Sequence, residues 1–385
     1  MRAEKFLGRE EPAELQITRA DRSYVFNERG RRYIDFLSGW CVGNLGWNHR
    51  AVNAALRQFR GPDYVYPEHG YRPWNELAER LSRAAPGSLT KSFRATGGSE
   101  AIELALQAAM VHTGRRKLLT LNGAYHGNTI GALSLAGSEN REQYPNLLES
   151  HNTVAPPLDD RALGKIETRL KRRDVAAFIM EPVSINLGVL APLKPSMQRL
   201  EALCERYGTL LVMDEVACGF GRTGTLFATE QFEIEPDIIC LGKAITAGVL
   251  GLGAMITTDA VGKSMQEEGS FWSTYGWHPR SVAAAIATVK FMTANRQKLM
   301  ANVAAMSEYF RTRLLEKFND DQLSIRGLAI CIKLESEDEA EELRKECQRR
   351  GVIVTTQDER VLLLPALTIT RPVAARGLDI LLAAA

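Results

Sequence analysis

Two side chains that could do chemistry stand at the ends of successive apolar runs in the middle of the chain. Asp214 follows the run 211–213, and Lys243 follows the run 237–241 after a single glycine. Both runs have the length and composition of buried strands. Because ligands of open α/β sheets bind beyond the carboxyl ends of the strands, an acid and a lysine at two such ends form a candidate site.

This pair of side chains suits pyridoxal phosphate. The cofactor requires a lysine that forms a Schiff base with its aldehyde and an aspartate that holds its ring nitrogen. A buried carboxylate against that nitrogen raises its pKa, so the ring stays protonated and can accept electrons. Taken singly, Asp214 is more typical of a helix cap and Lys243 of a solvated loop, so only the two together favour the site.

A phosphate site is predicted at residues 96–100, Thr-Gly-Gly-Ser-Glu, where a strand gives way to a helix. Free backbone N–H groups and the dipole at a helix N-terminus favour a phosphate dianion. The glycines allow close approach of the backbone, and Ser99 can add a hydroxyl donor. By itself the same pattern is more typical of an ordinary turn and N-cap, and it gains weight only beside the lysine.

Aromatic residues stand in two glycine-rich loops. Tyr125 and His126 follow a strand and suit the stacking of an aromatic face on a planar cofactor, although a single loop histidine is more often structural. Trp40, Trp47 and His49 lie in an earlier loop. They could line a pocket, or equally form a surface aromatic patch or a subunit contact.

The turn 219–224 satisfies the pattern G-x-G-x-x-G of dinucleotide-binding proteins. That pattern should open a helix that holds a pyrophosphate at its N-terminus. Here β-branched residues follow in 225–229, and the acids Asp214 and Glu215 precede it and would repel a pyrophosphate. We therefore interpret the match as a coincidence, and a nicotinamide oxidoreductase as a remote alternative.

The elements around these residues predict an α/β fold with a mostly parallel sheet covered by helices on both faces. We expect an N-terminal hairpin in 1–44 that joins the small domain, a large domain over 45–280, and a smaller α+β domain with a linking helix over 281–385. The predicted strands span 92–95, 117–121, 175–180, 210–213, 237–241, 253–257, 324–334, 352–355 and 361–364. The predicted helices span 75–85, 100–112, 161–172, 195–207, 279–292, 299–318, 337–350 and 374–384.

Composition narrows the class of protein. The 385 residues are 45% hydrophobic and 24% charged, which is typical of a globular protein of two domains. A net charge of +2 favours neither nucleic acid nor a membrane surface as a partner. The six cysteines show no C-x-x-C pairing, and the chain starts without an apolar signal segment. We expect reduced thiols, no metal and a cytoplasmic location.

Taken together, these motifs resemble the class III (ω-amino-acid type) pyridoxal-phosphate aminotransferases of fold type I. The resemblance covers nearly the whole chain, and an ordered set of this kind is far more specific than any single motif. It implies a seven-stranded sheet in the large domain. The segments that carry it are 97–103, 125–127, 181–183, 214–216, 219–224, 242–244 and 273–276, the last before an alanine-rich helix.

The resemblance implies roles for the residues around the ring. Lys243 would form the Schiff base and then move the proton between the substrate carbon and the cofactor. Asp214 would hold the pyridinium, Tyr125 would stack on one ring face, and Val216 would pack on the other. Glu181, in the Glu-Pro-Val segment, would also belong to the cofactor site.

The resemblance also implies how the phosphate is held. Gly98 and Ser99 would bind it, joined by Thr274 from the neighbouring subunit. The active site would then lie at the interface of a homodimer.

Several positions depart from the pattern of the family. Ala217 stands where members often carry a glutamine that bonds the phenolic oxygen of the cofactor. Ornithine-type enzymes pair an arginine with a glutamate to bind the carboxylate of 2-oxoglutarate, and here those places fall to Leu362 and Asn186. Arg360 could point the same way as Leu362 on a strand, and Trp40 replaces a substrate-contacting tyrosine.

The sequence thus predicts transamination by a ping-pong mechanism through Lys243, between an amine donor and an oxo acid, ketone or aldehyde. An aminomutase, racemase or decarboxylase would use the same cofactor residues, so these remain alternatives. A non-catalytic regulator that binds pyridoxal phosphate is a more distant one. The Trp-rich loop favours a donor with an apolar or ring-bearing body.

Overall fold

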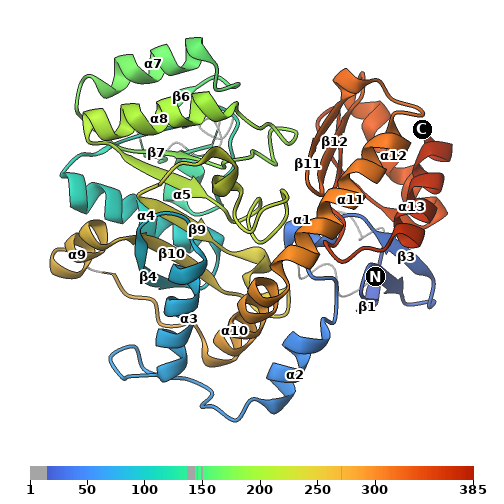
Figure 1. Ribbon diagram of the computed structural model, residues 1–385, viewed down its shortest axis with the longest axis horizontal. Helices are drawn as coiled ribbons and strands as arrows, with labels where there is room; N and C mark the ends of the chain where they lie inside the picture. The colour runs from blue at the N-terminus through green and yellow to red at the C-terminus, as the bar shows by residue number, and fades with distance from the viewer. Residues whose placement is uncertain (1–14, 137–143, 145, 149–150, 270) are drawn as a thin grey trace.

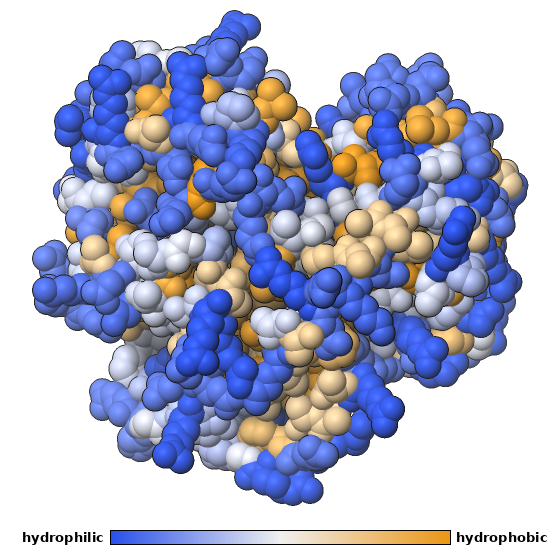
Figure 2. Space-filling model, viewed as in Figure 1, coloured by the Kyte–Doolittle hydropathy of each residue, from blue (hydrophilic) through white to orange (hydrophobic). Residues whose placement is uncertain are grey.

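The computed structural model describes the chain except for residues 1–14, 137–143, 145, 149–150 and 270. Figure 1 shows two lobes, of which the smaller contains the first described strands and the C-terminal helix. The same view in Figure 2 shows an indentation between the lobes and a largely hydrophilic surface. Within the described residues no helix is long and apolar enough to cross a membrane.

The larger lobe is built on a seven-stranded sheet in the order β4-β10-β9-β8-β7-β5-β6. Only β10 runs antiparallel to its neighbours, so the predicted mostly parallel sheet is confirmed. The strands are β4 (Leu89–Ala95), β5 (Lys117–Leu121), β6 (His151–Val154), β7 (Val175–Met180), β8 (Leu210–Asp214), β9 (Ile238–Leu241) and β10 (Gly253–Thr258).

Helices cover both faces of this sheet because its central strands are apolar on both sides. Along β8, Leu210 and Val212 pack with α4, α5 and α9, whereas Leu211 and Met213 pack with α7, α8 and α10. Successive side chains of a strand point to opposite faces, so a continuous apolar run requires two covering layers. The helices are α2 (Arg50–Gln58), α3 (Arg72–Ala84), α4 (Gly98–Thr113), α5 (Ile130–Ser134), α7 (Asp160–Leu170), α8 (Lys194–Tyr207), α9 (Asp259–Glu267) and α10 (Pro279–Ala294).

The smaller lobe contains an antiparallel sheet in the order β11-β12-β15-β14. Its strands are β11 (Leu323–Arg326), β12 (Ala329–Lys333), β14 (Thr355–Gln357) and β15 (Arg360–Leu363). Its helices are α11 (Arg296–Leu314), α12 (Glu337–Arg350) and α13 (Arg371–Ala384). The lobe is therefore α+β, as predicted.

Two of the strands predicted in this lobe are wrong in detail. The single strand over 324–334 is a hairpin of β11 and β12, because Gly327 has a φ of 57° and turns the chain. The strand over 352–355 is divided between two sheets. Its first part, β13 (Val352–Ile353), leaves for the N-terminal sheet, while β14 pairs with β15.

The strand β13 connects the N-terminal strands to the smaller lobe. The strands β1 (Ile17–Asp21), β2 (Tyr24–Asn27) and β3 (Arg32–Asp35) form an antiparallel sheet, and β13 pairs with β3 in parallel. The domain limits remain predictions. The predicted boundary near residue 280 falls at the start of α10. This helix packs against α2 and α3 at the base of Figure 1.

The glycine-rich turn 219–224 connects the two lobes. Arg222 is fully buried, and its Nη1 donates to the carbonyl oxygens of Leu328 (2.8 Å) and Pro365 (2.6 Å). Its Nη2 donates to Oδ1 of Asn44 at 2.6 Å. The turn opens no helix, since residues 217–227 are turns and bends before the short 3-10 helix η2 (Ala228–Phe232). In this fold the turn therefore connects the two lobes.

Candidate active site

A cavity of about 150 Å³ opens at the carboxyl ends of β5, β7, β8 and β9. It brings together seven of the predicted cofactor-site residues. Ligands of α/β sheets bind at this edge because the strands end there and loops converge above them. The cavity is lined by Gly98, Ser99, Tyr125, His126, Gly127, Glu181, Asn186, Asp214, Val216, Ala217 and Lys243.

Lys243 is the half-buried lysine of this cavity, one residue beyond the glycine that follows β9. It starts the 3-10 helix η3 (Lys243–Thr246) with a φ of 43°, in the left-handed region. A non-glycine residue in that region is strained, and such strain is kept where the surrounding structure holds it. The backbone is tightly packed beside it, with the Cα of Gly98 next to Gly242, and Lys243 lines the cavity.

Asp214 is almost fully buried and makes two hydrogen bonds. Its Oδ2 lies 2.7 Å from Nδ1 of His126, and its Oδ1 accepts from the backbone N–H of Val216 at 3.0 Å. The other ring nitrogen of His126 lies 3.3 Å from Oγ1 of Thr120. Both ring nitrogens of His126 are thus occupied, and the histidine orients the aspartate. The sequence offered only the Tyr-His-Gly loop as a sign of this contact.

Glu181 is a second buried carboxyl group in the cavity. Its Oε2 accepts from the N–H of Ile185 and its Oε1 from Nδ2 of Asn186, each at 3.3 Å. Burial and, next, the nearby charge of Asp214 raise its pKa from 4.5 to about 7. Two carboxyl groups at one strand edge cannot both ionise freely. Glu181 therefore changes charge near neutral pH.

The neighbouring Glu215 points away from the cavity. Its carboxylate accepts from the N–H groups of Ala228 and Thr229 and from the Thr229 hydroxyl. Burial raises its pKa, and these hydrogen bonds oppose that shift. Glu215 therefore fixes the start of η2 and takes no part in the cavity.

The predicted phosphate site lies at the N-terminus of α4. The N-cap, Gly97, has no side chain to accept hydrogen bonds from the first turn, so those backbone N–H groups can serve a ligand. Gly98 is required by packing, since a Cβ there would lie 2.8 Å from Cγ1 of Val216. The Ser99 hydroxyl accepts from the backbone N–H of Asn128 at 3.2 Å and lines the cavity.

An aromatic and an aliphatic side chain also line the cavity. Tyr125 lies at the rim with 47% of its surface exposed, and Val216 lies beside Gly98 inside. Both line the cavity with Asp214 and Lys243. This arrangement is compatible with a ring held between an aromatic and an aliphatic side chain.

Three predicted residues lie outside this lining. Thr274 is exposed on the segment that follows residue 270. Arg360 is in β15, where its guanidinium pairs with Asp358 and Glu359 at 3.2 Å each. Its Cδ also approaches Gly188, in the loop that carries Asn186.

Trp40 stands in a strained turn. Every residue of the segment α1 (Ser38–Cys41) has a positive φ, between 48° and 64°. Asp35 stabilises this turn by accepting from the N–H groups of Leu37 and Ser38 and from Nε1 of Trp47. Trp40 itself packs half-buried against the main core. The sequence predicted a loop here, whereas residues 38–41 form the short helical turn α1 with left-handed backbone angles.

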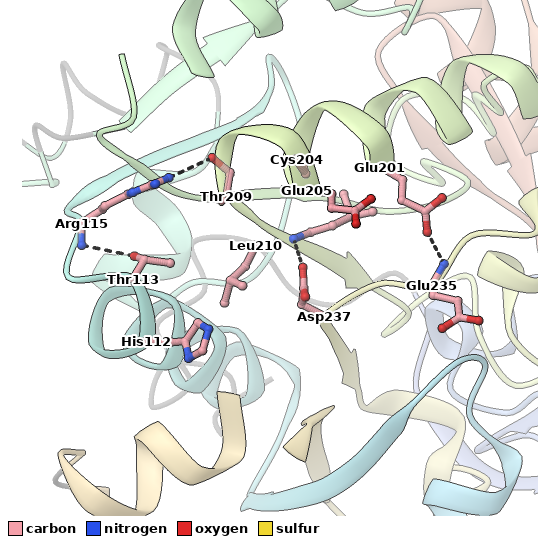
Figure 3. Close-up of a pocket in the computed structure, with 12 residues that line it drawn as sticks. His112, Thr113, Arg115, Glu201, Cys204, Glu205, Thr209, Leu210, Glu235 and Asp237 are labelled. Carbon is pink, nitrogen blue, oxygen red and sulfur yellow. Dashed lines mark hydrogen bonds between the residues drawn. The ribbon is translucent and has the colours of Figure 1, made fainter. Parts of the chain in front are cut away.

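A larger cavity of about 730 Å³ opens at the opposite, N-terminal edge of β8 and β9 (Figure 3). Two of its polar side chains already bond to the protein: Arg115 to the carbonyl oxygens of Val175 and Tyr207, and Asp237 to the N–H of Leu211. No lysine lines it, and it lies away from Asp214 and Lys243. Volume alone therefore does not identify the site, and we assign the smaller cavity.

The residues of the smaller cavity fit pyridoxal phosphate. A strained lysine, a buried aspartate–histidine pair and an uncapped helix N-terminus meet within it. They offer an amine for the aldehyde, a carboxylate for the ring nitrogen and N–H groups for the phosphate.

Comparison with known proteins agrees with this chemistry. Residues 7–385 match the family model "Aminotransferase class-III". The chain is 34% identical to an acetylornithine aminotransferase of Archaeoglobus fulgidus, over 95% of this chain and 94% of that protein. It is also 34% identical to a 5-aminovalerate aminotransferase of Pseudomonas aeruginosa, over 82% and 78% of the two chains.

Solved structures share the fold over almost the whole chain. An (S)-enantioselective ω-transaminase from Thermomicrobium roseum has a TM-score of 0.90 at 29% identity, covering 98% of this chain and 93% of that one. A pyridoxal-phosphate-bound amine transaminase from an uncultivated Pseudomonas species has a TM-score of 0.87 at 28% identity, covering 98% and 97%. The cavity, the family match and these neighbours agree, and the chain belongs to the class III family of pyridoxal-phosphate-dependent aminotransferases.

Proposed function

We propose that the chain transfers an amino group from an amine donor to an oxo acid, ketone or aldehyde in two half-reactions, with Lys243 as the acid/base group. The observation that carries this proposal is the strained, half-buried lysine in one cavity with the Asp214–His126 pair. Asp214 ends β8 and Lys243 follows the adjacent strand β9, so the two groups can engage different parts of one ring.

Each residue of the cavity then has a defined task. Pyridoxal phosphate, when bound, supplies the electron sink that lowers the barrier to losing a proton from the substrate carbon. Nζ of Lys243 would take up and release that proton. Asp214, which His126 orients, would hold the ring nitrogen. Tyr125 covers the open side of the cavity.

The N-terminus of α4 would hold the phosphate, through the backbone at Gly98 and the hydroxyl of Ser99. Val216 would pack on the ring face opposite Tyr125. Glu181 would add a polar group to the lining of the cavity.

The donor would be a primary amine at the end of an aliphatic chain or beside a ring. The relatives are named for acetylornithine, 5-aminovalerate and putrescine, all of which carry such an amine. Leu362 is fully buried, and its aliphatic side chain has no donor or charge with which to bind a carboxylate. Arg360, two residues earlier on β15 and close to Gly188, is the candidate for the carboxylate of an oxo acid, and Trp40 for the body of the donor.

A homodimer with active sites at the interface would complete the enzyme. Four exposed aromatic side chains form two ring pairs on one surface, Tyr64 with Tyr275 and Tyr66 with Trp272. Their exposed fractions of 42% to 64% are large for aromatic residues, and Thr274 lies among them in the sequence. Clustered exposed aromatics mark protein contacts, so this surface is where a second copy would dock.

The compartment is also a proposal. All six cysteines are free and buried, which supports a reducing location such as the cytoplasm.

The test is to load the protein with pyridoxal phosphate, add one amine at a time, and follow the cofactor absorbance. A productive donor changes the spectrum, and a later oxo acid restores it while being consumed in equal amount with the amine. Loss of carbon dioxide or an isomerised amine without consumption of oxo acid would instead indicate a decarboxylase or aminomutase. If only short ω-amino acids react, the preference for an apolar body is wrong.

A further inference from the structure

The amide of Asn186 offers the cavity an uncommitted hydrogen-bond donor. The residue is half-buried and lines the cavity in the loop after β7. Its Nδ2 donates one hydrogen to Oε1 of Glu181 at 3.3 Å. In the described part of the chain no second acceptor bonds this nitrogen. One N–H of the amide therefore remains for a ligand.

The polar groups nearest to Asn186 in the cavity are already committed. His126 uses both ring nitrogens, on Asp214 and on Thr120. Both oxygens of Glu181 accept hydrogen bonds from the loop 185–186. Lys243 is reserved for the aldehyde of the cofactor. Since Ser99 is assigned to the phosphate and Tyr125 lies at the rim, Asn186 is left as the donor beside the ring.

Strand order decides which part of the ring meets Asn186. Across the sheet edge, Ser99 follows β4, Lys243 follows β9, Asp214 follows β8 and Asn186 follows β7. On pyridoxal, the carbon that carries the aldehyde lies between the carbon of the phosphate arm and the carbon of the hydroxyl. If the phosphate arm is held at Ser99, the aldehyde at Lys243 and the ring nitrogen at Asp214, the hydroxyl would lie on the side of the ring away from Ser99, toward the β7 loop.

We propose that Asn186, oriented by Glu181, donates a hydrogen bond to the ring hydroxyl oxygen of bound pyridoxal phosphate. This inference rests on the proposed function. Ala217 lines the same cavity, but its methyl group has no donor to offer. Asn186 thus supplies from the β7 loop a contact that residue 217 lacks. When the ring oxygen is negatively charged, this hydrogen bond is of the stronger, charge-assisted kind.

The test compares holoenzymes of the parent and Asn186→Ala by two measurements, the Kd for pyridoxal phosphate and the pH midpoint of the visible absorbance change. Loss of a donor to a charged oxygen should raise the Kd roughly tenfold. It should also raise the pH midpoint by about one pH unit, because the deprotonated form loses most of the stabilisation. Asn186→Asp removes both N–H donors at nearly constant volume and should shift both values the same way.

Two further variants sharpen the result. Asn122→Ala removes an exposed asparagine near the end of β5, outside the cavity lining, and should change neither value. Adding Ala217→Gln to Asn186→Ala supplies a new donor and should bring the pH midpoint back toward the parent.

The inference is overturned if Asn186→Ala has the same pH midpoint as the parent. A rise in Kd alone would indicate only that the site has become less well ordered. The inference is equally overturned if the added glutamine restores nothing. A parent protein that binds no pyridoxal phosphate would refute the proposed function instead, so the two failures are distinguishable.

Discussion

Glu181→Gln should change how the stability of the cofactor-stripped protein depends on pH. The folded protein raises the pKa of Glu181 from 4.5 to about 7, chiefly because the carboxyl group is fully buried and secondly because Asp214 lies near. The folded state therefore holds this proton more tightly than the unfolded state does. The contribution of this proton to the free energy of unfolding is fully present below pH 4.5. It is lost as the pH rises to about 7, and above that pH the loss levels off.

The magnitude follows from the two pKa values. Their difference of about 2.5 corresponds to about 3 kcal/mol, the cost of ionising the buried carboxyl group. Glutamine has nearly the same shape and stays neutral, so the variant should escape this cost. Relative to the parent, Glu181→Gln should gain up to about 3 kcal/mol between pH 4.5 and pH 8.

The assay is urea denaturation of both proteins at matched concentration and at several pH values from 4.5 to 9. Titrating groups that do not interact with residue 181 contribute equally to both, so the difference in unfolding free energy isolates residue 181 and its coupling to neighbours such as Asp214. The difference should rise up to pH 7 and then stay flat, which provides an internal control. A difference that is constant with pH would refute the reasoning about burial.

Four further outcomes are expected. Lys243→Ala should lose the visible absorbance of the bound cofactor and at least about a thousandfold of amine transfer, measured by oxo acid consumption. His126→Ala leaves the buried carboxylate of Asp214 without its 2.7 Å partner and should weaken cofactor binding roughly tenfold in an absorbance titration, with His126→Asn less affected. Arg222→Met leaves three buried acceptors unpaired and should lower the free energy of unfolding by about 3 kcal/mol, seen as a lower midpoint in urea. Tyr275→Glu should shift the protein from dimer to monomer in sedimentation, whereas an unchanged dimer would place the interface elsewhere.

The sequence was most informative where a strand is buried on both faces. The limits predicted for β7 and β5 match the structure, and β8 and β9 differ by one residue, because uninterrupted apolar runs have few other solutions. Prediction failed where the pattern is short or polar. No strand was expected at β6 (His151–Val154), and the turn at Gly327 inside an apolar stretch was missed.

The candidate site likewise has one part that the sequence predicts and another that only the structure shows. The sequence alone determined that Asp214 and Lys243 follow strands, and strand ends of one sheet converge whatever the details of packing. Only the tertiary structure decided that His126, 88 residues from Asp214, holds that aspartate, and that Asn186 turns its amide toward Glu181. Periodicity in a sequence reports which face of an element is buried. It carries no record of which polar side chains from different loops meet, because that depends on how the loops pack above the sheet.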